Sequence, residues 1–219
     1  MEAETKEDIP MKAGEFFELL WTNVTVLCRN TVEFFKVAAR YYSCFPFLKA
    51  DMSLRLMYLF HNPYKISKRF LMNKGAKDVH AYGETPLTSL EKIATACGIK
   101  KEDTVFELGS GRGRTCFWLN SVIGCRVVGI EYVPEFVERA DLIKDRLGIE
   151  GVEFRLEDML KADFTGATVI YLYGTCLEDA SITKLCKAFS KLKPGTRIIT
   201  VSYPLTDYED KPCFEVMKR

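Results

Sequence analysis

Apolar residues between positions 15 and 42 recur at intervals of three and four, which is the spacing of one face of an α-helix. This face consists of Phe17, Leu20, Val24, Leu27, Thr31, Phe34, Ala38 and Tyr41, and is widened by Phe16, Leu19, Phe35 and Tyr42. The longest uncharged run, residues 19–28, reaches only about half of the length that a bilayer core requires. The pattern predicts one long helix, whose apolar face either packs within the chain, lies on a membrane surface or contacts another subunit.

Two shorter helices are predicted next, over residues 48–60 and 63–72, because Pro63 interrupts the helical pattern. The second helix and its exit are basic, with Lys65, Lys68, Arg69, Lys74 and Lys77. A charge cluster of this kind is either a solvated face or a guide for an acidic partner or a membrane lipid. We assign residues 1–75 to an N-terminal helical extension and residues 76–219 to a second domain.

In the second domain, short apolar runs alternate with helical patterns, which is typical of an α/β protein with a parallel sheet. The predicted strands span residues 104–108, 126–130, 152–156, 168–172 and 196–202. The predicted helices span residues 86–97, 134–147 and 179–192, and a further helix opens at residue 114. Thr85 is the expected N-cap of the first of these helices, and Gly98 ends it.

Composition narrows the functional classes. The chain has 219 residues, 47% of them hydrophobic, and a net charge of +1, so a large core is expected and nothing argues for nucleic acid. Eight cysteines without C-x-x-C spacing and only two histidines predict no zinc or other metal site. The cysteines fit reduced core thiols of a cytoplasmic protein. The acidic N-terminus is unlike a signal peptide.

A glycine-rich turn stands between the first predicted strand and the next helix. Its glycines are Gly109, Gly111 and Gly113, and such a turn before a helix N-terminus marks a nucleotide site. A dinucleotide fingerprint would place the third glycine at Arg114, which keeps a phosphate-binding alternative open. The pattern E-x-G-x-G-x-G, which begins at Glu107, resembles motif I of the class I S-adenosylmethionine (SAM) methyltransferases. SAM has a cationic amino-acid end, which suits an acid before the loop.

Further positions match that family in order. Glu131, at the end of the second predicted strand, can accept hydrogen bonds from both ribose hydroxyls. The resemblance implies that Asp158 bonds the adenine amino group and that Met159 packs on the ring. The segment from Tyr82 to Thr85 resembles the lid of the SAM site, or is an ordinary capped turn. The candidate cofactor-binding residues are Tyr82, Thr85, Glu107, Gly109, Ser110, Gly111, Gly113, Glu131, Tyr132, Asp158, Met159 and Tyr173.

Within the class, the motifs are similar to those of two groups of protein-lysine methyltransferases, the Dot1 type and the type acting on the ATP synthase c subunit. The resemblance implies a Rossmann-like, mostly parallel sheet of six or seven strands, to which residues 213–218 could add one. It also implies a protein substrate with a target lysine. After the fourth strand, residues 173–176 lack the Asn/Asp-Pro-Pro-Tyr of enzymes that methylate amide or base nitrogens.

The chemistry of SAM sets the expected mechanism. Its sulfonium is already activated, so the protein has to align a neutral, dehydrated lysine amine with the methyl group. Tyr82, Tyr173 and Tyr203 are candidates for an aromatic channel, and Glu84 could accept a proton or hold the incoming ammonium. No single catalytic base is assigned.

Two alternative functions stay open, a small-molecule methyltransferase and a catalytically silent SAM-fold interaction protein. Residues 15–42 and 63–77 are the candidates for membrane-surface contact, which would make the cytoplasmic protein peripheral at a membrane. Residues 13–72 are expected to form a helical cap that covers or borders the mouth where Tyr82 and Tyr173 converge, and to help select the substrate.

Overall fold

The computed structural model describes residues 13–76, 78–174, 177–201, 203–208 and 213–217. Contacts divide the chain into two units, Met1–Arg40 and Tyr41–Arg219. The observed division therefore lies about 35 residues before the boundary predicted at residue 75. The difference arises because the second and third helices bury side chains against the sheet domain and belong to it.

The first unit is dominated by helix α1, Ala13–Tyr41, which confirms the predicted long helix. Its described side chains include several exposed large apolar groups, among them Trp21, which is 74% exposed, and Leu27, which is 66% exposed. None of the described helices combines the length and the apolar character that crossing a bilayer requires.

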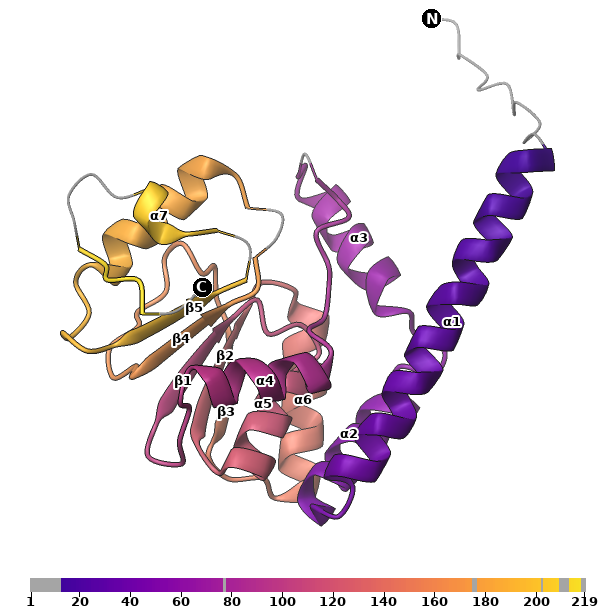
Figure 1. The fold of residues 1–219 in the computed structure, drawn as a ribbon, viewed down its shortest axis with the longest axis horizontal. Coiled ribbons are helices and arrows are strands. Elements are labelled where there is room, and N and C mark those ends of the chain that lie inside the picture. The colour runs from indigo at the N-terminus through magenta and orange to yellow at the C-terminus, as the bar shows by residue number, and fades with distance from the viewer. Residues whose placement is uncertain (1–12, 77, 175–176, 202, 209–212, 218–219) are drawn as a thin grey trace, which may run out of the picture. The chain divides into compact units, whose positions relative to one another are not determined.

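A five-stranded parallel sheet with the order β3-β2-β1-β4-β5 forms the centre of the second unit (Figure 1). The strands are β1 Thr104–Leu108, β2 Arg126–Glu131, β3 Val152–Leu156, β4 Val169–Leu172 and β5 Arg197–Thr200. All five lie where the apolar runs predicted them, and the α/β class is confirmed. The continuous burial of β1 and β4 follows from helices on both faces of the sheet.

The predicted count of six or seven strands is wrong, because the described sheet has five. Residues 213–217 were expected to add a strand, but they form none, and Val216 and Met217 are exposed. An additional strand requires a row of main-chain hydrogen bonds to an edge strand. Among the described residues after β5, the regular structure is the short 3-10 turn Leu205–Asp207.

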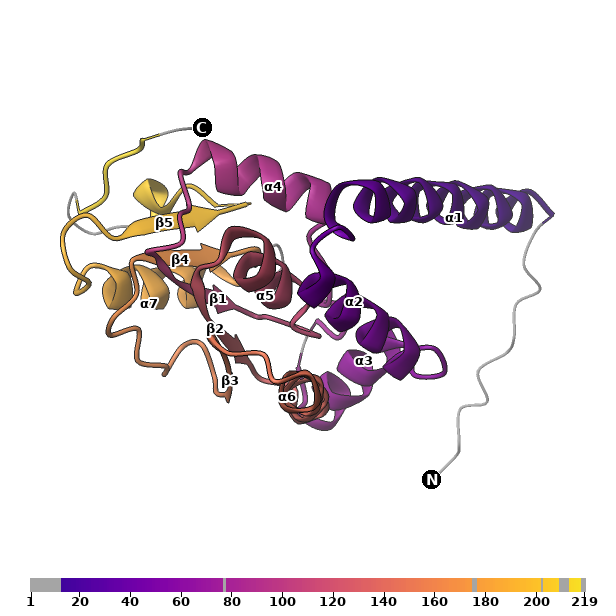
Figure 2. The same ribbon diagram turned by 90° about the horizontal axis from the view of Figure 1, so that it is seen from below.

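Helices cover the two faces of the sheet (Figures 1 and 2). On one face, Phe106 and Leu108 join an apolar core with Ile182 and Leu185 of α7, Asp179–Phe189. On the other face, Glu107 of β1 contacts α5, Arg114–Trp118. The domain also contains α4, Leu87–Ala96, α6, Pro134–Leu147, and the π-helical turn Leu119–Ile123 that continues α5.

The two helices before α4 pack on this domain. Helix α2, Phe45–Met57, begins three residues earlier than predicted, because Pro46 fits the first helical turn, where its missing N–H costs nothing. Helix α3 is Pro63–Asn73, and the Asn62 side chain caps it by accepting from the N–H of Tyr64 at 2.9 Å. The prediction that Thr85 is the N-cap of α4 is wrong. That position is Pro86, and the Thr85 hydroxyl instead lies 2.7 Å from the Tyr171 hydroxyl.

A buried ion pair ties α2 to α5. Asp51 is fully buried and accepts from Arg114 Nε at 2.6 Å and Nη2 at 3.1 Å. The Tyr42 hydroxyl at 2.7 Å and Arg55 Nε at 3.2 Å also donate to the Asp51 carboxylate. Burial alone would raise the pKa of Asp51, but the Arg114 guanidinium outweighs it and the pKa is lowered. Arg114 is thus committed to Asp51, which removes it as a phosphate ligand.

Replacing Asp51 by Asn should destabilise the protein by about 3–5 kcal/mol, because the buried Arg114 guanidinium then lacks a counter-charge. The free energy of unfolding in urea at neutral pH measures this loss. A lowered folded-state pKa gives stability that is present above the unfolded pKa and is lost as the pH falls through the folded value. The gap between parent and variant should therefore close in acid.

The matched control is Asp145→Asn, because Asp145 is exposed and its Lys144 partner lies 3.7 Å away. It should change the unfolding free energy by less than about 1 kcal/mol. Equal effects of the two substitutions would contradict the assigned role of the Asp51–Arg114 pair.

Candidate functional site

The turn between β1 and α5 organises the site. Gly109, Gly111 and Gly113 have φ angles of 78°, 53° and 76°, which only glycine adopts readily. The N–H groups of Gly109 and Ser110 donate to the carbonyl of Ile130 at 2.8 and 3.1 Å. The turn is therefore fastened to the end of β2.

Close packing leaves no room for a side chain at Gly113 and little at Gly111. A Cβ on Gly113 would lie 2.6 Å from the Phe154 ring and 3.3 Å from Ala140. A Cβ on Gly111 would lie 3.2 Å from the Tyr82 ring. The main chain of the turn thus approaches strand β3, helix α6 and the segment before α4 together.

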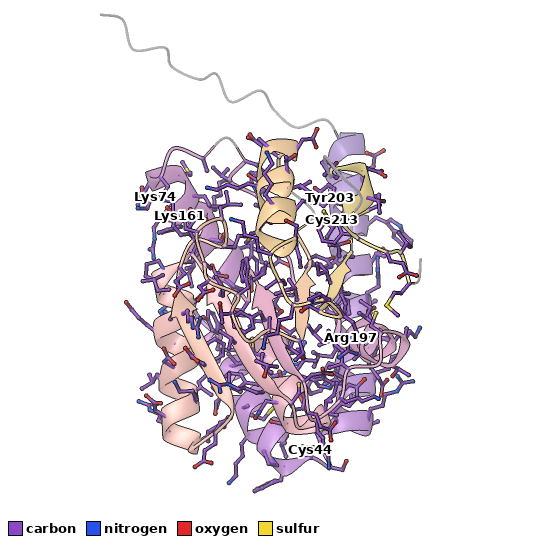
Figure 3. The ribbon with its side chains drawn as sticks, turned by 90° about the vertical axis from the view of Figure 1, so that its left-hand side faces the viewer. Cys44, Lys74, Lys161, Arg197, Tyr203 and Cys213 are labelled. Carbon is purple, nitrogen blue, oxygen red and sulfur yellow. The ribbon has the colours of Figure 1, made fainter. Side chains whose placement is uncertain are left out.

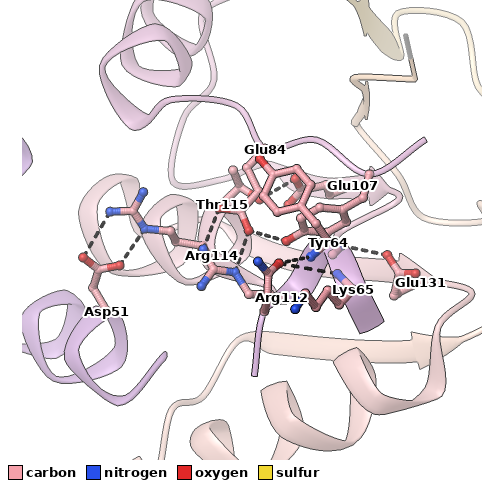
Figure 4. Close-up of polar contacts among 12 residues, drawn as sticks. Asp51, Tyr64, Lys65, Glu84, Glu107, Arg112, Arg114, Thr115 and Glu131 are labelled. Atoms are coloured by element: carbon pink, nitrogen blue, oxygen red, sulfur yellow. Dashed lines mark hydrogen bonds and ion pairs between the residues drawn. The ribbon is translucent and has the colours of Figure 1, made fainter. Parts of the chain in front are cut away.

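Glu131 is held at the end of β2 by main-chain donors (Figure 4). Its carboxylate accepts from the N–H groups of Gly111 at 2.7 Å, Tyr132 at 2.8 Å and Val133 at 2.8 Å. Burial raises its pKa, and the three N–H groups oppose this shift. A carboxylate offers about four acceptor positions, so these bonds leave capacity for a hydroxyl of a bound ligand.

Glu107 is buried beneath the turn. Its carboxylate accepts from the Thr115 hydroxyl and from Cys116 Sγ, the latter at 3.0 Å. Burial raises the pKa of Glu107 to about 7, against the lowering effect of these two bonds, and the charges of Glu131 and Glu84 add to the rise. Among the described residues no cation pairs with Glu107, so a cationic ligand group would complete its environment.

Glu84 has a different environment (Figure 4). Arg112 donates to its two oxygens from Nε at 2.5 Å and Nη2 at 2.7 Å, and the Tyr82 hydroxyl donates to it as well. Burial opposes ionisation, but the Arg112 guanidinium lowers the pKa of Glu84. This carboxylate is an ion-pair partner that fixes Tyr82 and is poorly suited to take up a proton.

Aromatic rings border the turn on the side of α3. The Tyr82 ring meets Tyr64 of α3 edge to face at a centroid distance of 5.0 Å and lies 5.2 Å from Phe136. Tyr132 meets Phe70 of α3 at 5.2 Å. Helix α3 therefore borders the candidate site, as predicted for this part of the extension.

Two other predicted residues come from the segments after β3 and β4: Met159 reaches the turn, and Tyr173 reaches the segment before α4. The methyl of Met159 lies 3.6 Å from the Cβ position of Gly109, and a Tyr173 ring carbon lies 3.6 Å from that of Gly83. Asp158, next to Met159, accepts from the N–H of Leu160 at 2.9 Å. The turn, the ends of β2 and β3, and the segment before α4 thus meet at one edge.

Tyr203 contacts residues that follow β4 and β5. Its hydroxyl donates to the carbonyl of Leu177 at 3.3 Å, and its ring meets Tyr208 edge to face. Figure 3 places Tyr203 at the same end of the molecule as Lys74 and opposite Cys44. It belongs to the β5–α7 side of that end.

Sequence reasoning missed three residues of the site, Arg112, Tyr64 and Phe136. Arg112 lies inside the motif, but no local spacing pairs it with Glu84, which is 28 positions away. The aromatic partners of Tyr82 come from two different helices. The sequence did place Arg112 between two glycines of the motif, so its position in the turn could be predicted. Its ion-pair partner could not.

Known proteins resemble this part of the chain. Residues 107–211 match a family model described as the ANTKMT methyltransferase domain. An H3 lysine-79-specific histone-lysine N-methyltransferase of Dictyostelium discoideum is 28% identical over 137 residues, which are 55% of this chain and 7% of that protein. A protein-lysine N-methyltransferase of Saccharolobus islandicus is 23% identical over 137 residues, 62% of this chain and 84% of that protein.

Among solved structures, an RNA methyltransferase of Salinibacter ruber in complex with S-adenosyl-L-homocysteine is 32% identical, with a TM-score of 0.49. The match covers 54% of this chain and 76% of that one. The matched residues 107–211 include the glycine turn, the acid at the end of β2 and strands β2 to β5. The chain belongs to the class I SAM-dependent methyltransferases.

Proposed function

We propose that this chain binds SAM at the carboxyl edge of its sheet and transfers the methyl group to a lysine side chain of a protein. The observation that carries the proposal is the meeting of the glycine turn, Glu131 and the segment from Tyr82 to Thr85 at one edge. Both sequence relatives named above bear a lysine methyltransferase name.

The residues present fit SAM. Glu107 is a buried carboxylate without a described cationic partner, and SAM carries an ammonium and a sulfonium. Glu131 has acceptor capacity for the ribose hydroxyls, and we assign Asp158 and Met159, which follow β3, to the adenine. When bound, SAM supplies an activated methyl group, so the protein contributes binding, alignment and the exclusion of water.

The acceptor side favours a neutral amine. Burial raises the pKa of Tyr82 far above its usual value, so its hydroxyl keeps its proton and stays bonded to Glu84. Tyr82 and Tyr173 flank Gly83 and offer apolar ring surface to the methylene stem of a lysine. Glu84 is paired with Arg112, so we assign it to positioning Tyr82, and the amine loses its proton to water.

Incubation of the protein with methyl-labelled SAM and a cell lysate tests the substrate class. We expect a discrete labelled protein band that yields methyl-lysine on hydrolysis. Label confined to small-molecule extracts would replace the proposal by a small-molecule methyltransferase. Absence of SAM binding in calorimetry would instead support a catalytically silent interaction protein.

Replacing Glu131 by Ala should weaken SAM binding by roughly tenfold or more, because hydrogen bonds to a charged group contribute about 1.5–3 kcal/mol. Isothermal titration calorimetry measures the affinity. The control is Glu138→Ala, which changes an exposed glutamate of α6 and should leave the affinity unchanged. Equal affinities of both variants would contradict the place given to Glu131.

SAM binding should release protons near neutral pH. The pKa of Glu107 is about 7 in the free protein, and a cationic ligand would lower it, so binding expels a fraction of a proton. Because protons are released, the affinity should rise with pH up to about 7 and then level off. Calorimetry in buffers of different ionisation enthalpy counts the protons. The variant Glu107→Gln should remove this release, and heats that are independent of buffer in the parent would disprove the coupling.

A further inference from the structure

The connection between α2 and α3 exposes a set of large apolar side chains. Phe60 is 88% exposed, Leu59 66%, Leu56 73% and Tyr64 59%. Soluble proteins rarely expose so many large apolar side chains close together without using them. The four positions lie within nine consecutive residues, from the last turn of α2 to the first turn of α3. Figure 2 shows the connection that joins the two helices. We call Leu56, Leu59, Phe60 and Tyr64 the apolar tip.

The chain segment that carries this tip is rich in basic residues. The sequence contains no Asp or Glu between Asp51 and Asp78. The basic residues in that interval are Arg55, Lys65, Lys68, Arg69, Lys74 and Lys77. Lys65 and Lys68 are three positions apart on α3, so they share one exposed face of the helix. The net charge of the whole chain is only +1, so this interval concentrates a charge that the rest of the chain balances.

The other face of α3 packs against the domain. Ile66 and Ser67 are buried, Tyr64 meets Tyr82, and Phe70 meets Tyr132. Arg69 pairs with Glu135 at 2.9 Å. The helix is thus anchored on the domain by one face, and Leu59, Phe60, Lys65 and Lys68 are exposed beside it.

We propose that the apolar tip inserts into the interface of a lipid bilayer with anionic head groups, with Lys65 and Lys68 at the phosphate level. Leu, Phe and Tyr side chains gain free energy at that depth, and each nearby lysine adds attraction to anionic lipid. The long lysine stems reach the head groups while the apolar side chains stay below them. An acidic protein surface would satisfy the lysines but would leave Phe60 without an apolar partner.

The proposal does not depend on the substrate of the domain. It has a consequence for the site, however. Because Tyr64 belongs to the tip and also contacts Tyr82, a bilayer bound at the tip would lie beside the edge where the site residues meet.

Cosedimentation of the full chain with vesicles tests the proposal. The vesicles contain phosphatidylcholine alone or phosphatidylcholine mixed with phosphatidylserine. We expect binding to the mixed vesicles and much weaker binding to the neutral ones. Leu59→Ser combined with Phe60→Ser, and separately Lys65→Glu combined with Lys68→Glu, should each lower the partition coefficient at least about tenfold.

Matched variants control for charge and for hydrophobicity. Lys184→Glu combined with Lys191→Glu makes the same charge change at exposed lysines in or next to α7. Val216→Ser combined with Met217→Ser removes an exposed apolar pair elsewhere. Both should bind like the parent. Helix α1 is present in every protein, so any contribution from its exposed apolar residues cancels from the comparison.

Tryptophan fluorescence tests directly whether the tip enters the bilayer. In a Trp21→Phe background, the tryptophan introduced by Phe60→Trp should emit at shorter wavelength when mixed vesicles are added. The emission of the buried Trp118 should not change. Equal binding to neutral vesicles, or tip variants that bind like their controls, would overturn the proposal. Retention on poly-glutamate without vesicle binding would replace the bilayer by an acidic protein surface.

Discussion

The turn at residues 109–113 is the constraint on which the domain depends. Within five residues the chain has to leave the largely buried strand β1 and start α5, and three glycines with positive φ make this reversal. The same turn is fastened to β2 through the carbonyl of Ile130 and the carboxylate of Glu131. Strand order, the direction of α5 and the position of the site are thereby set together.

Three carboxylates within this edge show how local partners decide charge. Glu84 is partly exposed beside Arg112, and the guanidinium lowers its pKa. Glu107 is more deeply buried and meets a hydroxyl and a thiol, and burial raises its pKa. Glu131 meets three main-chain N–H groups, which counter burial only in part. One residue class thus supplies a permanent anion, a group poised near neutrality and a fixed acceptor.

Local patterns were enough to predict the strands, the glycine turn and the acid at the end of β2, because each depends on neighbouring residues. Local patterns could not predict which residues pair across long distances in the sequence. The pairs Asp51–Arg114 and Glu84–Arg112 join segments 63 and 28 positions apart, and only the packed domain selects them. The strand count failed for another reason, since it was carried over from the resemblance to a family and not from residues 213–217 themselves.

The Asp51–Arg114 pair also bears on the order in which the chain can fold. During synthesis α2 leaves the ribosome before β1, α5 and α6, the elements on which it packs. Until then the nearest cation recorded beside Asp51 is Arg55, one helical turn away. Contacts this distant in sequence form late and slowly. Residues 41–219 are therefore expected to fold as one cooperative event, and a nascent chain that stops short of α5 would hold its α2 face open to chaperones.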